Sequence, residues 1–509
     1  MIENHKGVGE ASDLASRTSG AVRSALGWNL ANHGLSQLVT VGVFLFLASR
    51  LDPAVFGVFA LATIVVEAVA TEARIAMIDL IVVRREFSRV ALSTSFLSAM
   101  AGAVAAYLLV VLASPILGAV LGVPSLGAVA TVLGLAILAA PLLAVYEALL
   151  LKDLRFGLVA ARNLTATLVS AAATVSFAIH GPEEWSLVVQ RLSAILAGLL
   201  VLAPLARWTP SFAFDRNLAQ SSLRPFWSLW LGQMINFGLN RAPDLLIGVR
   251  LGPELLGVYR VAARVVDMVL SAVTAPLSGV FIPVLTQFAH DRAGQAEQYK
   301  QIAALSALLT APALVGLALI SRDLTPLVLD ARYAQAGIVV TMLAVAGLAA
   351  PFAHFRGGIL VAAGRPGLAA ALALLDLATT AVAVWIGAGF GLAQASAAVL
   401  AASMVAAAVS AFAVARVLDA SMGALLRSSA PPFVAAVVMA AALAAGAPIA
   451  ADWPGWIRVG AAAGLGAAVF GSHLALLHLD WVRARVAYLL KRDGKGGDDI
   501  EPPLSQTVL

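Results

Sequence analysis

The chain carries one motif twice: Arg50-Leu51-Asp52-Pro53 followed by Gly57-Val58-Phe59, and again Arg250-Leu251-Gly252-Pro253 followed by Gly257-Val258-Tyr259. The same register, without a gap, also aligns Ala62 with Ala262 and Glu67 with Asp267. Each copy lies between long apolar segments. A motif repeated at a constant offset indicates internal duplication, which is common in membrane proteins built from two related halves. The motif therefore predicts a duplicated membrane protein whose halves share one topology.

Composition supports an integral membrane protein. Of 509 residues, 61% are hydrophobic and 12% are charged, whereas soluble domains are about 45–50% apolar and about 25% charged. Long Ala-, Leu- and Val-rich segments do not show the alternation of a β-barrel. Backbone groups in lipid must be bonded internally, so the spans are expected to be helices. The predicted fold is all-α, with about 14 transmembrane helices.

A span requires about 20 apolar residues, and this criterion predicts the following segments. They are 27–49, 55–82, 91–113, 126–151, 158–179, 185–206, 224–249, 255–285, 301–320, 336–362, 367–388, 391–415, 430–450 and 455–478.

The distribution of Lys and Arg predicts the orientation. With a cytoplasmic N-terminus, most basic residues fall in cytoplasmic segments, and the opposite side holds only Arg50, Arg250, Arg322, Arg332 and Arg458. The basic segment after Trp481 then also lies inside. We therefore expect both termini to be cytoplasmic and the number of spans to be even.

The repeat offset equals six spans, so the two copies have the same orientation and are parallel repeats. This predicts an N-terminal tail (1–26), an N-lobe of spans 1–6 (27–206), a cytoplasmic linker (207–223) and a C-lobe of spans 7–12 (224–415). Two extra spans (416–478), expected to be peripheral or to face a partner, and a cytoplasmic tail (479–509) complete the chain.

Charges within the predicted spans mark the candidate site. Each charge at a helix centre costs about 2.5–3.5 kcal/mol to insert, so a set of them is expected to face protein or water. Arginine suits phosphate because its guanidinium stays charged and binds oxyanions bidentately. The candidate substrate-binding residues are Arg74, Arg241, Arg260, Arg264 and Arg356. The carboxylates proposed to couple transport to protons or sodium are Glu67, Asp244 and Asp267.

Two purely structural explanations of these in-span charges remain open. Interior Arg–Asp pairs can simply join helices, and residues near span ends, such as Glu72, Asp79 and Arg191, can snorkel or cap instead. In the repeat, Pro53 and Pro253 fit the first position of a helix. Gly57 and Gly257 fit close helix packing. These last four residues are therefore expected to be structural.

Soluble-enzyme signatures are absent from the sequence. There is no cysteine, no phosphate-binding loop and no HExxH zinc motif. No metal, cofactor or ATPase activity is expected. Energy would come from an ion gradient or from the substrate's own concentration difference.

The stretch from Trp28-Asn29-Leu30 to Phe56-Gly57 resembles the opening of Wzx-type flippases, the polysaccharide transport family of the multidrug/oligosaccharidyl-lipid/polysaccharide exporter superfamily. The second copy, from Asp244-Leu245-Leu246-Ile247-Gly248 to Tyr259-Arg260-Val261-Ala262, is similar to that family's second-lobe signature. The resemblance covers about residues 20–480 and marks the superfamily better than the substrate.

The resemblance implies two six-helix lobes in a V around a polar cavity that opens alternately to each side of the bacterial inner membrane. The implied substrate is an undecaprenyl-pyrophosphate-linked oligosaccharide, moved to the periplasmic leaflet for exopolysaccharide, capsule or O-antigen assembly. A polysaccharide polymerase or co-polymerase is an expected partner, and nucleic acid is not.

Three other functions are compatible with a membrane protein of this kind. A multidrug cation antiporter of the same superfamily would share the fold, but the in-span arginines argue against it, because a cation site would favour carboxylates and aromatics. A membrane glycosyltransferase or polymerase would need a large extramembrane loop, and the longest predicted loops are short. A scaffold would not need charged faces on its spans.

Overall fold

The computed structural model describes residues 34–83, 88–153, 155–287 and 291–490. These residues are helical almost throughout, and no strand occurs among them. The all-α prediction is confirmed. The predicted N-terminal tail 1–26, and the part of the C-terminal tail after residue 490, lie outside the described residues.

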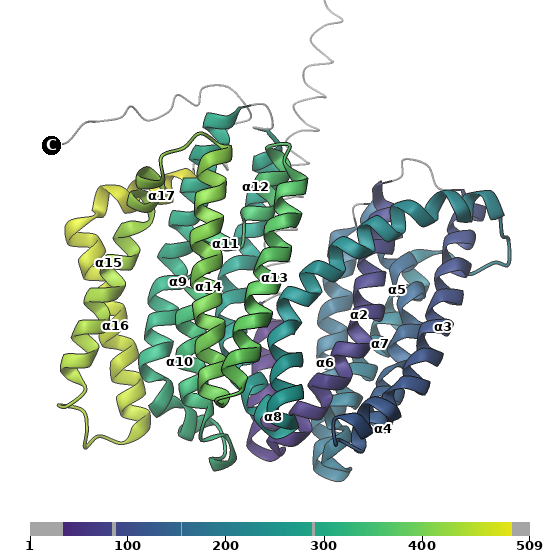
Figure 1. Cartoon of the computed structure of the whole chain (residues 1–509), viewed down its shortest axis with the longest axis horizontal. Coiled ribbons are helices and arrows are strands. Elements are labelled where there is room, and N and C mark those ends of the chain that lie inside the picture. Colours follow the sequence, from purple (N-terminus) through teal and green to yellow (C-terminus); the bar gives the residue numbers. More distant parts are fainter. Residues whose placement is uncertain (1–33, 84–87, 154, 288–290, 491–509) are drawn as a thin grey trace, which may run out of the picture. The chain divides into compact units, whose positions relative to one another are not determined.

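The helices follow one another with short connections (Figure 1). The first helix is described from Gly34 to Arg50. It is followed by α2 (Pro53–Val83), α3 (Arg89–Val120), α4 (Ser125–Leu133), α5 (Leu135–Lys152), α6 (Phe156–His180), α7 (Ser186–Ala206), α8 (Arg216–Gln287) and α9 (Arg292–Val328). The remaining helices are α10 (Ala336–Gly347), α11 (Ala350–Ala353), α12 (Arg356–Ala362), α13 (Pro366–Ala388), α14 (Leu392–Val417), α15 (Met422–Gly446), α16 (Gly455–Leu477) and α17 (Leu479–Leu490). Two 3₁₀ turns, η1 (Glu183–Trp185) and η2 (Ala331–Tyr333), lie between helices.

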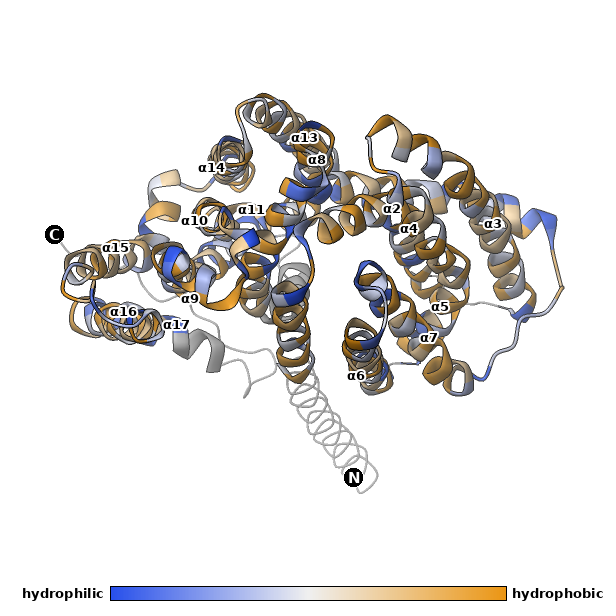
Figure 2. Ribbon diagram, turned by 90° about the horizontal axis from the view of Figure 1, so that it is seen from below, coloured by the Kyte–Doolittle hydropathy of each residue, from blue (hydrophilic) through white to orange (hydrophobic). Residues whose placement is uncertain are grey.

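Within the described ranges, ten helices are long and apolar enough to cross a membrane. An eleventh arises if the pair Ala336–Gly347 and Ala350–Ala362, bent by 41°, is one span. The predicted first, seventh and eighth spans are also helical, but the first is described over 17 residues and α8 is not among the ten. Hydrophobic residues cover most of the helices in Figure 2. The protein is a multi-pass membrane protein, and the number fourteen stays a prediction.

Both copies of the repeated motif interrupt a helix at the same place. In the first copy, α2 begins at Pro53, where the side-chain Oδ1 of Asp52 accepts a hydrogen bond from the Ala54 amide (2.9 Å). In the second copy, Gly252 has φ +82° and ψ 174°, which splits α8 into residues 216–251 and 253–287. A positive φ favours glycine, and proline suits the first position of the helix that follows. The motif therefore encodes a helix break and restart.

The chain forms two compact units. The first contains the residues up to Met268 with Leu324–Leu343 and Ala370–Ser403. The second contains Val269–Asp323, Ala344–Ala369 and the residues from Met404. These units reflect how the helices pack, whereas the lobes expected from the repeat reflect duplication of the sequence. The lobe boundaries therefore stay a prediction.

A hydrophobic core joins α2, α3, α5 and α7 in the first unit, and it extends into the predicted linker. The indole of Trp208 is buried and packs edge-on against Phe96 (5.6 Å between centroids) and Tyr146 (6.1 Å). The Ser211 hydroxyl lies 2.6 Å from that of Ser93. The segment 207–215 is thus packed against the N-lobe helices, and α8 begins at Arg216, eight residues before the predicted span.

In the second unit, α15 and α16 pack on each other and on α9. Buried side chains of Met439, Phe470 and Leu474 meet the buried Ala311 of α9. The indole Nε1 of Trp481, in α17, donates to the Ser428 carbonyl (3.1 Å). The two extra C-terminal helices are therefore part of a packed core on at least one face.

Candidate functional site

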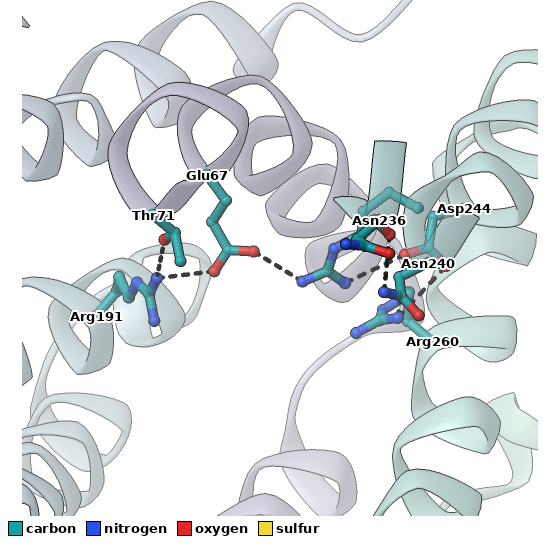
Figure 3. A network of polar contacts seen from close by, with 8 residues as sticks. Glu67, Thr71, Arg191, Asn236, Asn240, Asp244 and Arg260 are labelled. Atoms are coloured by element: carbon teal, nitrogen blue, oxygen red, sulfur yellow. Dashed lines mark hydrogen bonds and ion pairs between the residues drawn. The ribbon is translucent and has the colours of Figure 1, made fainter. Parts of the chain in front are cut away.

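Five charged side chains in the first unit form one continuous line of ion pairs (Figure 3). Glu67 of α2 accepts from Arg191 of α7 (2.8 Å) and from Arg241 of α8 (2.7 Å). Asp244 accepts from Arg241 (3.3 Å) and from Arg260 (3.0 Å), which lie on either side of the break at Gly252. We call these five residues the arginine network.

The two carboxylates are the most buried side chains of the network. The side chain of Asp244 is 2% exposed and that of Glu67 is 15% exposed, while Arg241 and Arg260 are 24% and 22% exposed. Breaking a buried ion pair on one side leaves an uncompensated charge and is strongly unfavourable. Three arginines share two carboxylates, so the network carries an excess positive charge. It is suited to receive an anion.

Neutral polar groups surround the network. The Thr71 hydroxyl, one turn after Glu67, accepts from Arg191 (3.3 Å). Asn236 and Asn240 lie on the α8 side of the network (Figure 3), and the Asn240 amide donates to the Asn236 carbonyl (2.9 Å). Thr, Asn and Arg groups at one place can bind both an oxyanion and sugar hydroxyls.

The other candidate residues are placed differently. Arg74 pairs with Glu147 of α5 rather than with the network. Arg264 and Asp267 follow Arg260 on α8 and make no ion pair within the part of the chain described; Asp267 is exposed. Arg356 belongs to the second unit, where it is buried and donates to the Ser410 hydroxyl (2.7 Å). The structure thus brings together Glu67, Arg241, Asp244 and Arg260.

The contacts of two arginines were not predicted from the sequence. Arg191 was read as a snorkelling residue near a span end, but it pairs with Glu67. Arg162, which was not singled out from the sequence, lies within α6, half-buried against Gly198 of α7. Neither contact follows from sequence spacing, because both partners are distant in the chain. The sequence signal for such a contact is an arginine within an otherwise apolar segment.

The two repeat motifs contact each other reciprocally. A Cβ built on Gly57 would lie 1.7 Å from the Pro253 carbonyl oxygen, and one built on Gly257 would lie 1.7 Å from that of Pro53. The same surface of each copy therefore faces the other, as in a two-fold symmetric contact. Only glycine leaves room for this approach.

The turn η2 closes over this contact. The buried Tyr333 hydroxyl donates to the Leu51 carbonyl (2.9 Å), and Arg332 donates to the Arg50 carbonyl (3.1 Å). Arg332 also lies 3.7 Å from Asp52. A hydrogen bond from the Arg332 backbone amide, and a second one from its side chain, lower the pKa of Asp330 below its usual value. Residues 50–53 are thus bound from both the second repeat and η2.

A family of known proteins matches the part of the chain that contains this site. The sequence pattern of the family described as "Polysaccharide biosynthesis protein" matches residues 46–337. The chain belongs to this family. The match includes every residue of the arginine network and both copies of the motif, so the family resemblance and the site coincide.

Curated relatives are distant and match in part. The chain is 26% identical over 65% of its length to the succinoglycan biosynthesis transport protein ExoT of Rhizobium meliloti, covering 67% of that protein. It is 25% identical over 44% of its length to the amylovoran biosynthesis protein AmsL of Erwinia amylovora, covering 58% of it. It is 22% identical over 63% of its length to the lipopolysaccharide biosynthesis protein WzxC of Escherichia coli, covering 65% of it. The matches thus span between half and two thirds of these relatives.

Solved structures establish the fold. The lipid II flippase MurJ, in an inward closed conformation, aligns with 89% of this chain and 99% of its own at a TM-score of 0.69 and 12% identity. An inward-facing multidrug transporter of the MATE family aligns with 76% of this chain and 96% of its own at a TM-score of 0.58 and 13% identity. The fold is that of MurJ and MATE transporters. Among these similar proteins, ExoT is a transport protein and MurJ is a flippase.

Proposed function

We propose that the protein is a flippase that moves an undecaprenyl-pyrophosphate-linked oligosaccharide from the cytoplasmic to the periplasmic leaflet of the bacterial inner membrane. The product would serve exopolysaccharide, capsule or O-antigen assembly, which agrees with the names of the relatives. The observation that carries the proposal is the arginine network, an excess of guanidinium groups inside a helical membrane protein.

The network suggests how pyrophosphate binds. Glu67 and Asp244 hold the guanidinium groups of Arg241 and Arg260 in place when no phosphate is present. A pyrophosphate offers more oxygens and more charge than either carboxylate, and arginine binds it bidentately. The substrate would therefore replace the carboxylates as the partner of Arg241 and Arg260, with Arg264 as a third contact.

This exchange of anions would change how helices are joined. Glu67 links α2 to both α7 and α8. When Arg241 turns to a phosphate, one of these links is released, and the relative stability of two conformations changes by the difference in their contacts. Alternating access by rocking of the repeats requires such a shift. The oligosaccharide would follow the headgroup past Asn236 and Asn240.

Coupling to protons or sodium is a further part of the proposal. Of the three candidate carboxylates, Glu67 is best placed, because neutralising it would release α2 from both α7 and α8, whereas both partners of Asp244 lie on α8. Asp244 is more deeply buried and Asp267 is exposed. Arg74 is already paired with Glu147, and Arg356 already donates to Ser410, so a direct contact of either arginine with the substrate stays a prediction. A polymerase or co-polymerase partner and cytoplasmic termini stay predictions.

The test is flipping in proteoliposomes. A fluorescent undecaprenyl-pyrophosphate-linked sugar is placed in both leaflets, and its exposure is followed by a glycosidase added outside. We expect the wild-type protein to equilibrate the leaflets, Arg241→Ala and Arg260→Ala to lose at least about tenfold in rate, and Arg241→Lys to be intermediate. Arg365→Ala, at an exposed position between α12 and α13, is the matched control.

Equal rates for Arg241→Ala, Arg260→Ala and the wild type would contradict the assignment of the network. No flipping by the wild type, together with drug resistance on overexpression, would favour the multidrug antiporter instead. The fold alone is compatible with both functions.

A further inference from the structure

The first unit contains a cavity of about 420 Å³ that the arginine network does not use. It lies between α2, α3, α5 and the N-terminal part of α8. Its volume falls within the range of small-molecule sites. Much of its wall is made of small side chains, among them Ala73, Ala99, Gly102, Ala103, Ala106 and Ala140.

The chemistry of the wall excludes a polar solute. Arg74 is its single charged residue, and that charge is paired with Glu147. The other polar groups are three serine hydroxyls and the indoles of Trp227 and Trp230. Without unpaired charges, the cavity favours an apolar ligand. Since α2 and α3 are apolar enough to cross a membrane, such a ligand would reach the cavity from lipid.

The cavity and the network share helix α2. Glu67, Thr71 and Arg74 are spaced by four and then three residues, so they lie along one face of the helix. The cavity wall is formed by a different face of α2, which carries Val69 and Ala73, and Arg74 lies at the border between the two faces. A phosphate held by the network and a chain in the cavity would therefore be joined near Arg74. This continuity indicates a lipid whose phosphate headgroup occupies the network.

We propose that this cavity binds the phosphate-proximal isoprene units of the substrate's polyprenyl chain. The proposal rests on the proposed function, because the headgroup must occupy the network. It assigns the small residues of α3 a role in recognising the lipid, because their short side chains leave room for the polyprenyl chain. The aromatic side chains of Phe226, Trp227 and Trp230 form the wall contributed by α8.

Gly102 gives a selective way to fill the cavity. A Cβ at Gly102 would meet no atom within 4 Å, so a larger side chain there enters open space without displacing the helix. The same is true of Gly464 on α16, which does not line the cavity. Gly102→Leu and Gly464→Leu are thus the same substitution in two apolar helices, one inside the cavity and one outside it.

The experiment measures binding to the purified full-length protein of three probes: inorganic pyrophosphate, farnesyl pyrophosphate and undecaprenyl pyrophosphate. We expect the prenyl compounds to bind the wild type and Gly464→Leu more tightly than pyrophosphate. Gly102→Leu is expected to weaken binding of both prenyl compounds by about tenfold or more, with inorganic pyrophosphate unchanged.

Equal affinity of Gly102→Leu and the wild type for prenyl pyrophosphates would overturn the cavity assignment while leaving the flippase proposal intact. Absence of any binding of the three probes to the wild type would overturn both. Displacement of farnesyl pyrophosphate by an equal concentration of phosphatidylglycerol would show a general site for acyl chains and would also overturn the assignment to the polyprenyl chain.

Discussion

Gly57 lies against the carbonyl oxygen of Pro253, and Gly257 lies against that of Pro53. The contact is reciprocal because each copy of the motif places its glycine against the proline carbonyl of the other, about an approximate two-fold axis. It joins the start of α2 to the break in α8, and Glu67 and Arg260 follow on these same helices. The repeat thus positions the arginine network.

We expect Gly57→Ala to reduce both stability and transport. Its Cβ would fall 1.7 Å from Pro253 O, so the helices must separate, and overpacking of this kind costs about 1–3 kcal/mol. Gly42→Ala in the first helix is the control, since a Cβ there meets nothing within 4 Å. The measurement is the apparent unfolding temperature in detergent. Equal temperatures for Gly57→Ala and Gly42→Ala would contradict the close approach.

The symmetry of the contact makes a second prediction. Gly257→Ala is expected to lower the unfolding temperature by about as much as Gly57→Ala, because the two clashes are equivalent. The double variant should cost less than the sum, since one separation of the helices relieves both clashes. If the decrease in unfolding temperature of the double variant equals the sum of the two single decreases, the two contacts are independent. That result would contradict the prediction that one separation of the helices relieves both clashes.

Asp244→Asn is expected to destabilise the protein in the absence of substrate. The side chain is 2% exposed and holds Arg241 and Arg260, and removing one partner of a buried ion pair costs about 3–5 kcal/mol. Asp452→Asn, at an exposed position, is the control. If pyrophosphate takes the place of the carboxylate, adding it should raise the unfolding temperature of Asp244→Asn. A variant as stable as the control would show that Asp244 is not needed to hold the arginines.

Tyr333→Phe tests how η2 is fastened to the first repeat. The variant keeps the buried ring and loses only the hydrogen bond to the Leu51 carbonyl (2.9 Å). Leaving that buried acceptor unpaired costs about 1–3 kcal/mol. Tyr107→Phe, on the half-buried middle of α3, is the matched substitution and should have little effect. Two equal changes in unfolding temperature would mean that the Tyr333 hydrogen bond adds no stability.

Much of the fold could be predicted from local sequence. Runs of apolar residues mark the helices because lipid requires internal hydrogen bonding, and Pro53 and Pro253 mark helix starts. The helix ends are less predictable: α8 extends back to Arg216 through a polar stretch because the preceding linker is tied down by Trp208 and Ser211. Those contacts depend on distant residues.

The charged partners were less predictable than the charged residues themselves. Glu67 and Arg74 share a face of α2, but seven residues of helix separate them by about 10 Å. Each therefore pairs across a helix interface instead, Glu67 with Arg191 and Arg241, and Arg74 with Glu147. Spacing along one helix identifies a face, while the partner on that face is chosen by tertiary packing.

The most direct test of the central claim is made in a deletion strain, by measuring the pool of lipid-linked oligosaccharide and assigning its leaflet by access to a periplasmic enzyme. We expect complete repeat units to accumulate on the cytoplasmic side. We expect the wild-type gene to restore export, and Arg241→Ala, inserted at normal levels, not to restore it. A normal pool with continued export in the deletion strain, or full restoration by Arg241→Ala, would contradict the central claim.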